Sequence, residues 1–239
     1  MAHDLNGSAQ DSVALAPARR RSPEPAALDR NLYAALDLGT NSCRMLIATP
    51  EAGRFRVVDA FAKSVRLGSG LERTGHLSRG AVGRTLAALE ICADKLERHR
   101  VANVRLVATE ACRRARNGNQ FLSLAARQTG LRLEVIRPEE EARLAVISCA
   151  PLVSPQASQL LVFDIGGGST ELIVGSQGDI LAARSLKIGA IRLTRRYFDG
   201  PKVTTKAVEA CRRDSRTALT PTVREVRRTG FDVAVGSSG

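Results

Sequence analysis

The chain has 239 residues, enough for one large domain or two modest ones, and its 44% hydrophobic content allows a real core although only 3% of the residues are aromatic. Its net charge of +12 favours an anionic partner, although an arginine-rich proteome would produce the same charge. The five cysteines lack CxxC spacing, which argues against structural zinc and disulfides and favours a reducing cytoplasm. No apolar stretch approaches the ~20 residues of a membrane span, so a transmembrane helix is not expected.

The segment before residue 31 has no sustained periodicity. Residues 1–30 mix Ala, Pro, Ser, Asp and Arg, a composition typical of a disordered tail. The arginines at 19–21 are followed by Ser-Pro-Glu-Pro and not by an apolar segment, so we do not expect the tail to act as an export signal. Order is expected to begin near Asn31. Three strands are predicted in succession, at 33–38, 43–49 and 54–62.

Helices and strands then alternate up to residue 150. After a polar, glycine-punctuated stretch at 63–71, Ser78 is the expected N-cap of a helix that ends near Arg98, because apolar residues recur every three and four positions along it. The other predicted elements are a strand at 104–108, a helix at 119–128 stopped by Gly130, a strand at 131–135 and a helix opened by Pro138.

A break at 151–155 is the expected hinge between two domains, which we place at 31–152 and 153–239. The order of elements restarts after it, with a strand that ends at Asp164. The elements predicted beyond that strand are strands at 172–174 and 180–185, helices at 190–198 and 205–219, and a strand at 231–235.

Two loops of the phosphate-binding type dominate the chain. Each follows an apolar run that ends in an aspartate, Asp37 within 34–42 and Asp164 within 161–171. Glycines expose backbone N–H groups that can cradle phosphate oxygens, and the aspartate can hold a metal or its water. A P-loop would instead lead from a strand into a helix and carry Gly-Lys-Ser/Thr, and neither condition is met. The repetition predicts a duplicated phosphate clamp that faces a shared cleft.

Six segments carry further patterns: DLGTNSCR (37–44), VRLGSGL (65–71), ATEACRRARN (108–117), PEEEARL (138–144), DIGGGSTE (164–171) and SLKIG (185–189). In this order they resemble the exopolyphosphatase/guanosine pentaphosphate phosphohydrolase (Ppx/GppA) family of the actin-like ATPase superfamily. The resemblance covers about 32–239. It implies an α/β fold with two actin-like (ribonuclease H-like) domains, each a mixed sheet flanked by helices, around a phosphate-binding cleft.

The resemblance also implies an activity. It points to a cytoplasmic phosphohydrolase, connected with the stringent response, that removes the terminal phosphate from inorganic polyphosphate, guanosine pentaphosphate or both. The expected cofactor is Mg²⁺, with or without a monovalent cation. No membrane and no specific nucleic acid are expected as partners, and a homodimer is allowed. Nothing in the sequence separates the two substrates.

The residues suit this chemistry, which needs a clamp for the phosphoryl group, neutralisation of its charge and an oriented water. The expected phosphate-binding residues are Thr40, Asn41, Ser42, Arg44, Arg113, Gly166, Gly167, Gly168, Ser169 and Thr170. For the two arginines, whose guanidinium groups match phosphate geometry, a surface salt bridge is the alternative. Asp164 and Glu171 are the expected Mg²⁺ ligands, directly or through water.

The resemblance places the catalytic base at Glu141, the last acid of a Pro-Glu-x-Glu-x-Arg pattern. A carboxylate beside the cleft can orient and deprotonate the attacking water. The alternative is that three consecutive glutamates only favour a helix N-terminus, and we prefer that interpretation for Glu139 and Glu140.

Three questions stay open at the level of sequence. The chain stops on a glycine-rich turn where the family continues, so we expect a C-terminally truncated member. An Arg/Lys-rich stretch at 192–228 is either a surface for a long polyanion or a solvated helix face. The competing functions are a non-catalytic module that binds polyphosphate or a nucleotide and, with weaker support, an actin-like kinase or ATPase.

Overall fold

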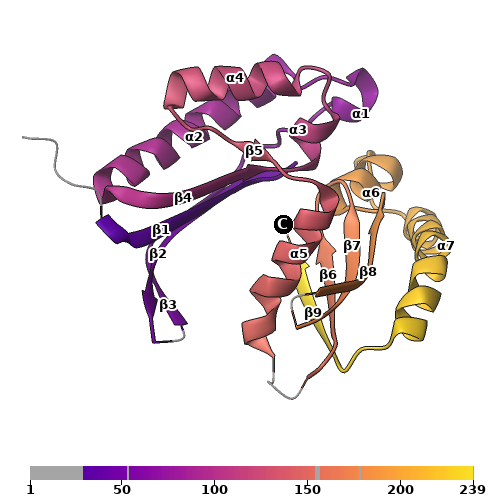
Figure 1. The fold of residues 1–239 in the computed structure, drawn as a ribbon. Coiled ribbons are helices and arrows are strands. Elements are labelled where there is room, and N and C mark those ends of the chain that lie inside the picture. Colours follow the sequence, from indigo (N-terminus) through magenta and orange to yellow (C-terminus); the bar gives the residue numbers. More distant parts are fainter. Residues whose placement is uncertain (1–28, 53, 154–156, 178, 239) are drawn as a thin grey trace, which may run out of the picture.

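The computed structural model describes residues 29–52, 54–153, 157–177 and 179–238. These residues form two β-sheets with their own helices, and helix α5 (Pro138–Cys149) lies between the sheets (Figure 1). Most of the tail predicted at 1–30 and part of the hinge predicted at 151–155 fall outside the described residues. Within the described part, no helix combines the length and the apolar character needed to cross a membrane.

The first sheet has five strands in the order β3-β2-β1-β4-β5. Their bounds are β1 (Asp29–Leu38), β2 (Ser42–Glu51), β3 (Arg54–Ser64), β4 (Val101–Ala108) and β5 (Glu134–Val135). β1, β2 and β3 are antiparallel, whereas β4 and β5 run parallel to β1. The helices of this half are α1 (Leu71–Thr74), α2 (Arg79–His99), α3 (Glu110–Arg114) and α4 (Gly118–Thr129). α2 and α4 cover one face of the sheet (Figure 1).

Strand alternation decides which side chains of β1 and β2 reach the other face. Leu36 on β1 and Cys43 on β2 are buried in the core beneath α2 and α4. Because successive side chains of a strand point to opposite faces, Asp37 and Arg44 lie on the face that these helices leave open. The two residues are direct partners in the β1–β2 pairing, so their side chains are neighbours on that face.

The second sheet repeats this topology with four strands in the order β8-β7-β6-β9. Its elements are β6 (Leu160–Ile165), β7 (Thr170–Ser176), β8 (Asp179–Leu186), α6 (Ala190–Tyr197), α7 (Thr205–Thr229) and β9 (Val233–Ser238), with a short 3₁₀ helix η1 (Ala150–Leu152) after α5. As in the first sheet, an antiparallel meander is followed by a strand parallel to its first member.

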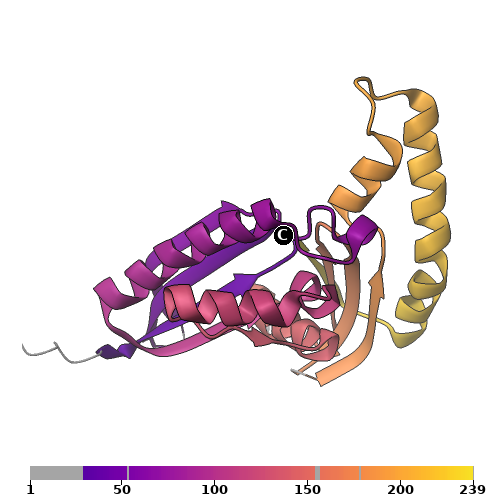
Figure 2. The ribbon, with the colours of Figure 1, turned by 90° about the horizontal axis from the view of Figure 1, so that it is seen from above.

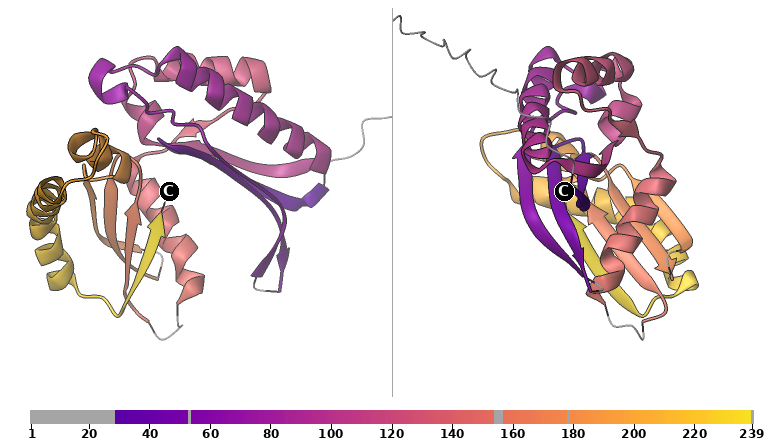
Figure 3. Two further views of the ribbon diagram at one scale, coloured as in Figure 1. Left: turned by 180° about the vertical axis from the view of Figure 1, so that it is seen from behind. Right: turned by 60° about the vertical axis from the view of Figure 1, so that its left-hand side comes forward.

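Helices cover both faces of the second sheet. α5 lies on the face that is turned toward the first sheet, and α7 lies on the opposite face (Figure 3). Val162 packs in the cluster with α5, whereas its neighbour Leu161 packs in the cluster with α7. By the same alternation, Asp164 and Glu171 lie on the α5 face. The position of these two carboxylates on the side of the cleft therefore follows from the two-residue alternation of side chains along β6 and β7.

Helix α7 is longer than the sequence predicts. The sequence predicts a helix at 205–219, whereas α7 continues to Thr229 and passes through Pro221, which lacks one backbone donor. The continuation buries Val226 against the second sheet, and this packing outweighs one missing hydrogen bond. α6 and α7 together stand to one side of the second sheet, away from α2 and α4 (Figure 2).

Other differences from the predicted elements are small. The strand predicted at 131–135 is paired only over β5, and the single-turn helices α1 and α3 are too short to produce a periodic signal. The predicted N-cap of α2 is confirmed, because the hydroxyl of Ser78 accepts a hydrogen bond of 3.3 Å from the amide of Ala81. Gly130 ends α4 in the left-handed conformation, also as predicted.

Candidate active site

The two predicted loops have nearly the same internal geometry. In the loop that joins β1 and β2, the amide of Gly39 donates to the carbonyl of Ser42 at 2.9 Å. In the loop that joins β6 and β7, the amide of Gly166 donates to the carbonyl of Ser169 at 3.0 Å. Each is a tight turn at the end of a hairpin, at the same place in its sheet. The predicted duplication is therefore present in the structure as two equivalent turns.

A glycine-containing segment supports the first loop from behind. The amides of Val65 and Arg66 both donate to the carbonyl of Asn41 at 2.8 Å, and the amide of Gly68 donates to that of Thr40 at 2.9 Å. A Cβ atom on Gly68 would clash with the side chain of Thr40, so glycine allows this close approach. The segment predicted at 63–71 thus holds the carbonyls of the loop on one side.

The start of α6 supports the second loop in the same way. Three of its amides hold three loop carbonyls: Gly189 to Gly168 at 3.3 Å, Ala190 to Gly166 at 2.9 Å and Arg192 to Gly167 at 3.1 Å. In a trans peptide the N–H points opposite to the C=O of the same unit. The amides of Gly167, Gly168 and Ser169 are therefore turned away from α6, and none of them donates to another described residue.

The tips of the two loops lie close together. A Cβ atom placed on Gly167 would lie 3.4 Å from the Cβ of Asn41 on the other loop. The amide of Asn41 also has no acceptor among the described residues. Backbone N–H groups without an acceptor among the described residues thus come from both loops and meet between the sheets. Such a group of donors is the basis of an anion-binding nest.

Carboxylates lie directly below the loops. Asp164 and Glu171 are partners in the β6–β7 pairing and occupy the positions equivalent to Asp37 and Arg44 in the first sheet. One carboxylate oxygen of Asp164, Oδ1, is buried without a hydrogen-bond partner among the described residues. Glu171 accepts a hydrogen bond of 2.6 Å from the hydroxyl of Ser185. Buried carboxylate oxygens of this kind are ligands that hard cations prefer.

The three consecutive glutamates at the start of α5 have different surroundings. Glu139 is exposed. Arg143 and Arg105 bind Glu140 on the outside and hold the pKa of that carboxyl down at about 2. Glu141 instead faces the cleft, where it lines one cavity of about 420 Å³ and a second of about 800 Å³. Of the three glutamates, Glu141 alone lines both cavities; Glu139 borders only the smaller one and stays exposed.

Glu141 has the electrostatic character of a base near neutrality. Burial raises the pKa of this carboxyl to about 7, against the opposing field of Arg113, and Glu171 and Asp37 raise it further. Arg113 lies 3.4 Å from the carboxylate and donates at 2.7 Å to the carbonyl of Ile136, which holds its guanidinium at the edge of the cleft. The pairing with Glu141 is long, so the arginine retains capacity for another anion.

Desolvation shapes the rest of the acidic cluster as well. It raises the pKa of Asp37, which faces the larger cavity with Arg44 and Asp164, and it raises the pKa of Glu171. Neighbouring acids add to both shifts. Repulsion among desolvated carboxylates is relieved by a cation or by protons. Among the described residues, no three His, Cys, Asp or Glu side chains are gathered as a ready-made metal site, so a bound ion would keep waters in its shell.

The structure brings most of the predicted site residues to this cleft. Thr170 is different, because it is buried and its hydroxyl donates at 3.2 Å to the carbonyl of Ile188, behind the loop. Sequence reasoning missed Ser185 on β8 and gave no role to Glu110, which accepts a hydrogen bond of 3.2 Å from the hydroxyl of Ser169. Both lie inside motifs that the sequence singles out, but their partners are far away along the chain.

Comparison with known proteins identifies the family of the chain. A profile of the Ppx/GppA phosphatase family matches residues 46–239. The structure of the Aquifex aeolicus member of the Ppx/GppA protein family is 31% identical at a TM-score of 0.70, and the match covers 86% of this chain and 65% of that chain. An exopolyphosphatase from Cytophaga hutchinsonii is 26% identical at a TM-score of 0.78, with 87% of this chain and 67% of that chain covered. A PilM–PilN type IV pilus biogenesis complex, 16% identical at a TM-score of 0.51, covers 87% of this chain and 81% of that chain and shares the actin-like fold alone.

Proposed function

Because the chain belongs to the Ppx/GppA phosphatase family, we propose that it removes the terminal phosphate from inorganic polyphosphate, guanosine pentaphosphate or both. The match spans 65% of the length of the Aquifex relative. The activity of the whole relative is therefore a proposal for this chain. The observation that carries the proposal is a single one. A desolvated glutamate, Glu141, lies beside an arginine and below two opposed loops whose amides lack partners among the described residues.

The two loops would clamp the phosphoryl group. Its negative charge spreads over three oxygens in the transition state, and donors that are already oriented stabilise it without reorganisation. The amides of Gly167 and Gly168 on one side and of Asn41 on the other supply such donors. Arg113 would neutralise charge at the edge of the clamp, where its guanidinium can reach two oxygens at once.

Glu141 would take the proton of the attacking water. A base works best when its pKa lies near the working pH, since it is then deprotonated and still basic. The pKa of about 7 for Glu141 meets this condition, and an exposed glutamate would be a far weaker base. Arg113 lowers this pKa and burial raises it, so the value depends on both.

Mg²⁺ is the cation that fits the carboxylates beside Glu141. Asp164, whose Oδ1 has no hydrogen-bond partner among the described residues, would hold the ion together with Glu171, directly or through water. Mg²⁺ is commonly bound by one or two carboxylates and keeps several waters. When bound, it supplies charge neutralisation to the phosphates. A monovalent cation stays a prediction without an assigned donor set.

The choice between the two substrates depends on groups beyond the reacting phosphates. A basic surface on α7 would favour a long polyanion, and affinity for long polyphosphate would then fall steeply as salt is raised. Affinity that hardly changes with salt would leave the arginines of α7 as a solvated helix face.

The decisive experiment measures phosphate release by the purified chain with Mg²⁺. Long-chain polyphosphate and guanosine pentaphosphate are the substrates, and Glu141→Gln and Glu139→Gln are compared with wild type. We expect phosphate release by wild type and by Glu139→Gln, and almost none by Glu141→Gln. Binding without release by wild type would support a non-catalytic module, and transfer of phosphate from ATP to a sugar would identify a kinase; either result would refute the proposal.

A further inference from the structure

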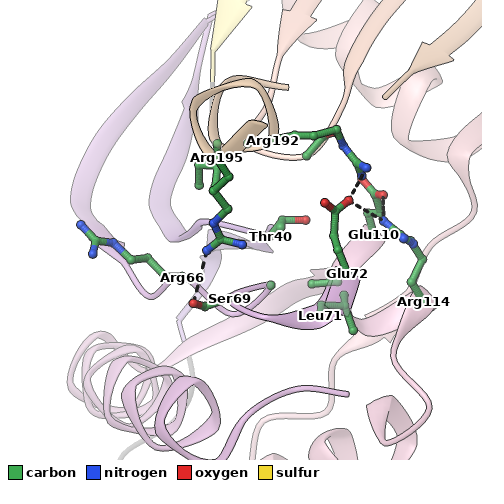
Figure 4. A pocket seen from close by; sticks show the side chains of 14 residues that line it. Thr40, Arg66, Ser69, Leu71, Glu72, Glu110, Arg114, Arg192 and Arg195 are labelled. Carbon is green, nitrogen blue, oxygen red and sulfur yellow. Dashed lines mark hydrogen bonds and ion pairs between the residues drawn. The ribbon is translucent and has the colours of Figure 1, made fainter. Parts of the chain in front are cut away.

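Four charged side chains form a continuous series of contacts beside the glycine loop 166–169. They are Glu72, Glu110, Arg114 and Arg192, and we call them the charged ring. α1 and α3 of the first half contribute three members, and α6 of the second half contributes the fourth (Figure 4). The ring therefore joins the two halves of the protein beside the cavity that Glu110, Arg114 and Glu141 line.

Two members of the ring, Arg192 and Glu110, form hydrogen bonds with the same loop. At one end, Nε of Arg192 donates at 2.7 Å to the carbonyl of Gly168. At the other end, the hydroxyl of Ser169 donates at 3.2 Å to Oε2 of Glu110. The two contacts lie on successive residues, so together they restrain the peptide unit between them.

Ion pairs connect the two ends. Arg192 pairs with Glu72 across the cleft, and Arg114 pairs with Glu110 at 2.9 Å. Nη1 of Arg114 also reaches Glu72 at 4.0 Å, the outer limit of an ion pair, which completes the circuit (Figure 4). The ring carries two charges of each sign. The members that touch the loop are the less exposed ones, at 18% for Arg192 and 21% for Glu110, so solvent screens them less than it screens surface pairs.

We propose that Arg192 and Glu110 are positioning residues for the glycine loop, and that the ring orients the loop through its contacts between the two halves. Glycines leave the loop free to rotate its peptide units. When Arg192 holds the carbonyl of Gly168, the amide of Ser169 must point the opposite way, away from α6. An amide oriented before the reaction contributes to transition-state stabilisation, and a mobile one does not.

The guanidinium of Arg192 is specifically suited to this task. It binds the Gly168 carbonyl through Nε and Glu72 through Nη1, so one planar group makes both contacts. Lysine has a single point-like ammonium and cannot reproduce this two-sided geometry. The substitution Arg192→Lys therefore keeps the charge and removes the fork.

Hydrogen exchange tests the positioning role without any substrate. The reporters are the amides of Gly189 and Ala190, which donate to the loop carbonyls. We expect exchange at least tenfold faster in Arg192→Lys and in Glu110→Ala, and a return toward wild type in Glu110→Gln, whose amide oxygen again accepts from Ser169. The second comparison is the more informative, because Glu110 lies on the other half of the protein.

Arg196→Lys is the matched control for exchange. Arg196 lies on the same helix but pairs with Asp214 of α7 at 3.3 Å, outside the ring. Unchanged exchange in this variant is expected. The proposal would be overturned if amide exchange were accelerated equally in the control. It would also be overturned if Arg192→Lys and Glu110→Ala both exchanged at the wild-type rate.

Activity provides a second readout, which rests on the proposed function. We expect kcat for phosphate release to fall at least tenfold in Arg192→Lys while KM changes less than threefold, and Glu72→Gln to add little to that loss because both act through one contact. Faster release in Glu72→Gln would mean that the glutamate withholds the arginine from the substrate, and would contradict a positioning role. Absence of release in wild type would refute the proposed function and leave the exchange experiment to decide this one.

Discussion

Replacement of Glu141 by glutamine tests the assignment of the base most directly. The two side chains have nearly the same shape, but the amide cannot accept a proton from water at neutral pH. Loss of a general base typically costs about 10²–10⁴-fold in rate. We therefore expect kcat for phosphate release to fall by about two to four orders of magnitude at pH 8, with KM changed little, because the clamp is formed by other residues.

The pH dependence gives a second measure of the same group. In wild type the base is active when deprotonated, so activity should rise about tenfold per pH unit below a pKa of about 7 and level off above it. The residual activity of Glu141→Gln should lack this limb. A series of initial rates from pH 5 to pH 9 in both proteins measures the difference.

Stability should change in the opposite direction. The folded-state pKa of about 7 exceeds the ordinary 4.5, so the folded state binds more protons than the unfolded state between these values. The free energy of unfolding then falls as pH rises through that window, and the ionised carboxylate is destabilising above it. A shift of this size corresponds to ~3 kcal/mol at ~1.4 kcal/mol per unit, which we reduce to about 1 kcal/mol because the side chain is 38% exposed.

These expectations can be refuted together. At pH 8 the glutamine variant should unfold about 2–4 °C above wild type, the shift expected for about 1 kcal/mol in a chain of this length. At pH 4 the two proteins should unfold at the same temperature. Glu139→Gln, an exposed position in the first turn of the same helix, is the control; it should leave the rate unchanged and lower stability by less than about 1 kcal/mol, through the loss of one charge at the helix N-terminus. If Glu141→Gln retained wild-type kcat, or if the acidic limb persisted in it, Glu141 would not be the base.

Three further predictions concern other parts of the cleft. Arg113→Gln removes a charge that lowers the pKa of Glu141, so the acidic limb should move to higher pH in rate profiles; an unchanged limb would separate the two residues. Gly189→Ala should destabilise the protein by about 1–3 kcal/mol in urea unfolding, because the added Cβ would clash with the backbone of Gly168, and unchanged stability would contradict the observed approach. Asp164→Asn should raise the Mg²⁺ concentration for half-maximal activity at least tenfold, and an unaltered titration would remove Asp164 from the metal site.

The elements near the cleft were predictable because their signals are local. Hairpins, the Ser78 cap and the glycine loops each depend on a few adjacent residues, and the family resemblance assigned the cleft. The end of α7 was mispredicted, since Pro221 is a local stop signal that packing of the second sheet overrides. The charged ring could not be predicted, because its members come from α1, α3 and α6, and only the tertiary fold brings these helices together.

The difference between the two halves is as informative as their likeness. The loops are equivalent, but position seven after the aspartate is an arginine in the first sheet, Arg44, and a glutamate in the second, Glu171. One half therefore places an arginine beside its aspartate, and the other places a second carboxylate there, the pair that we propose for Mg²⁺. Glu141 belongs to neither repeat, because it lies on α5, which follows the first sheet and packs on the second. Duplication explains the paired loops, and the proposed chemistry depends on the residues that break the symmetry.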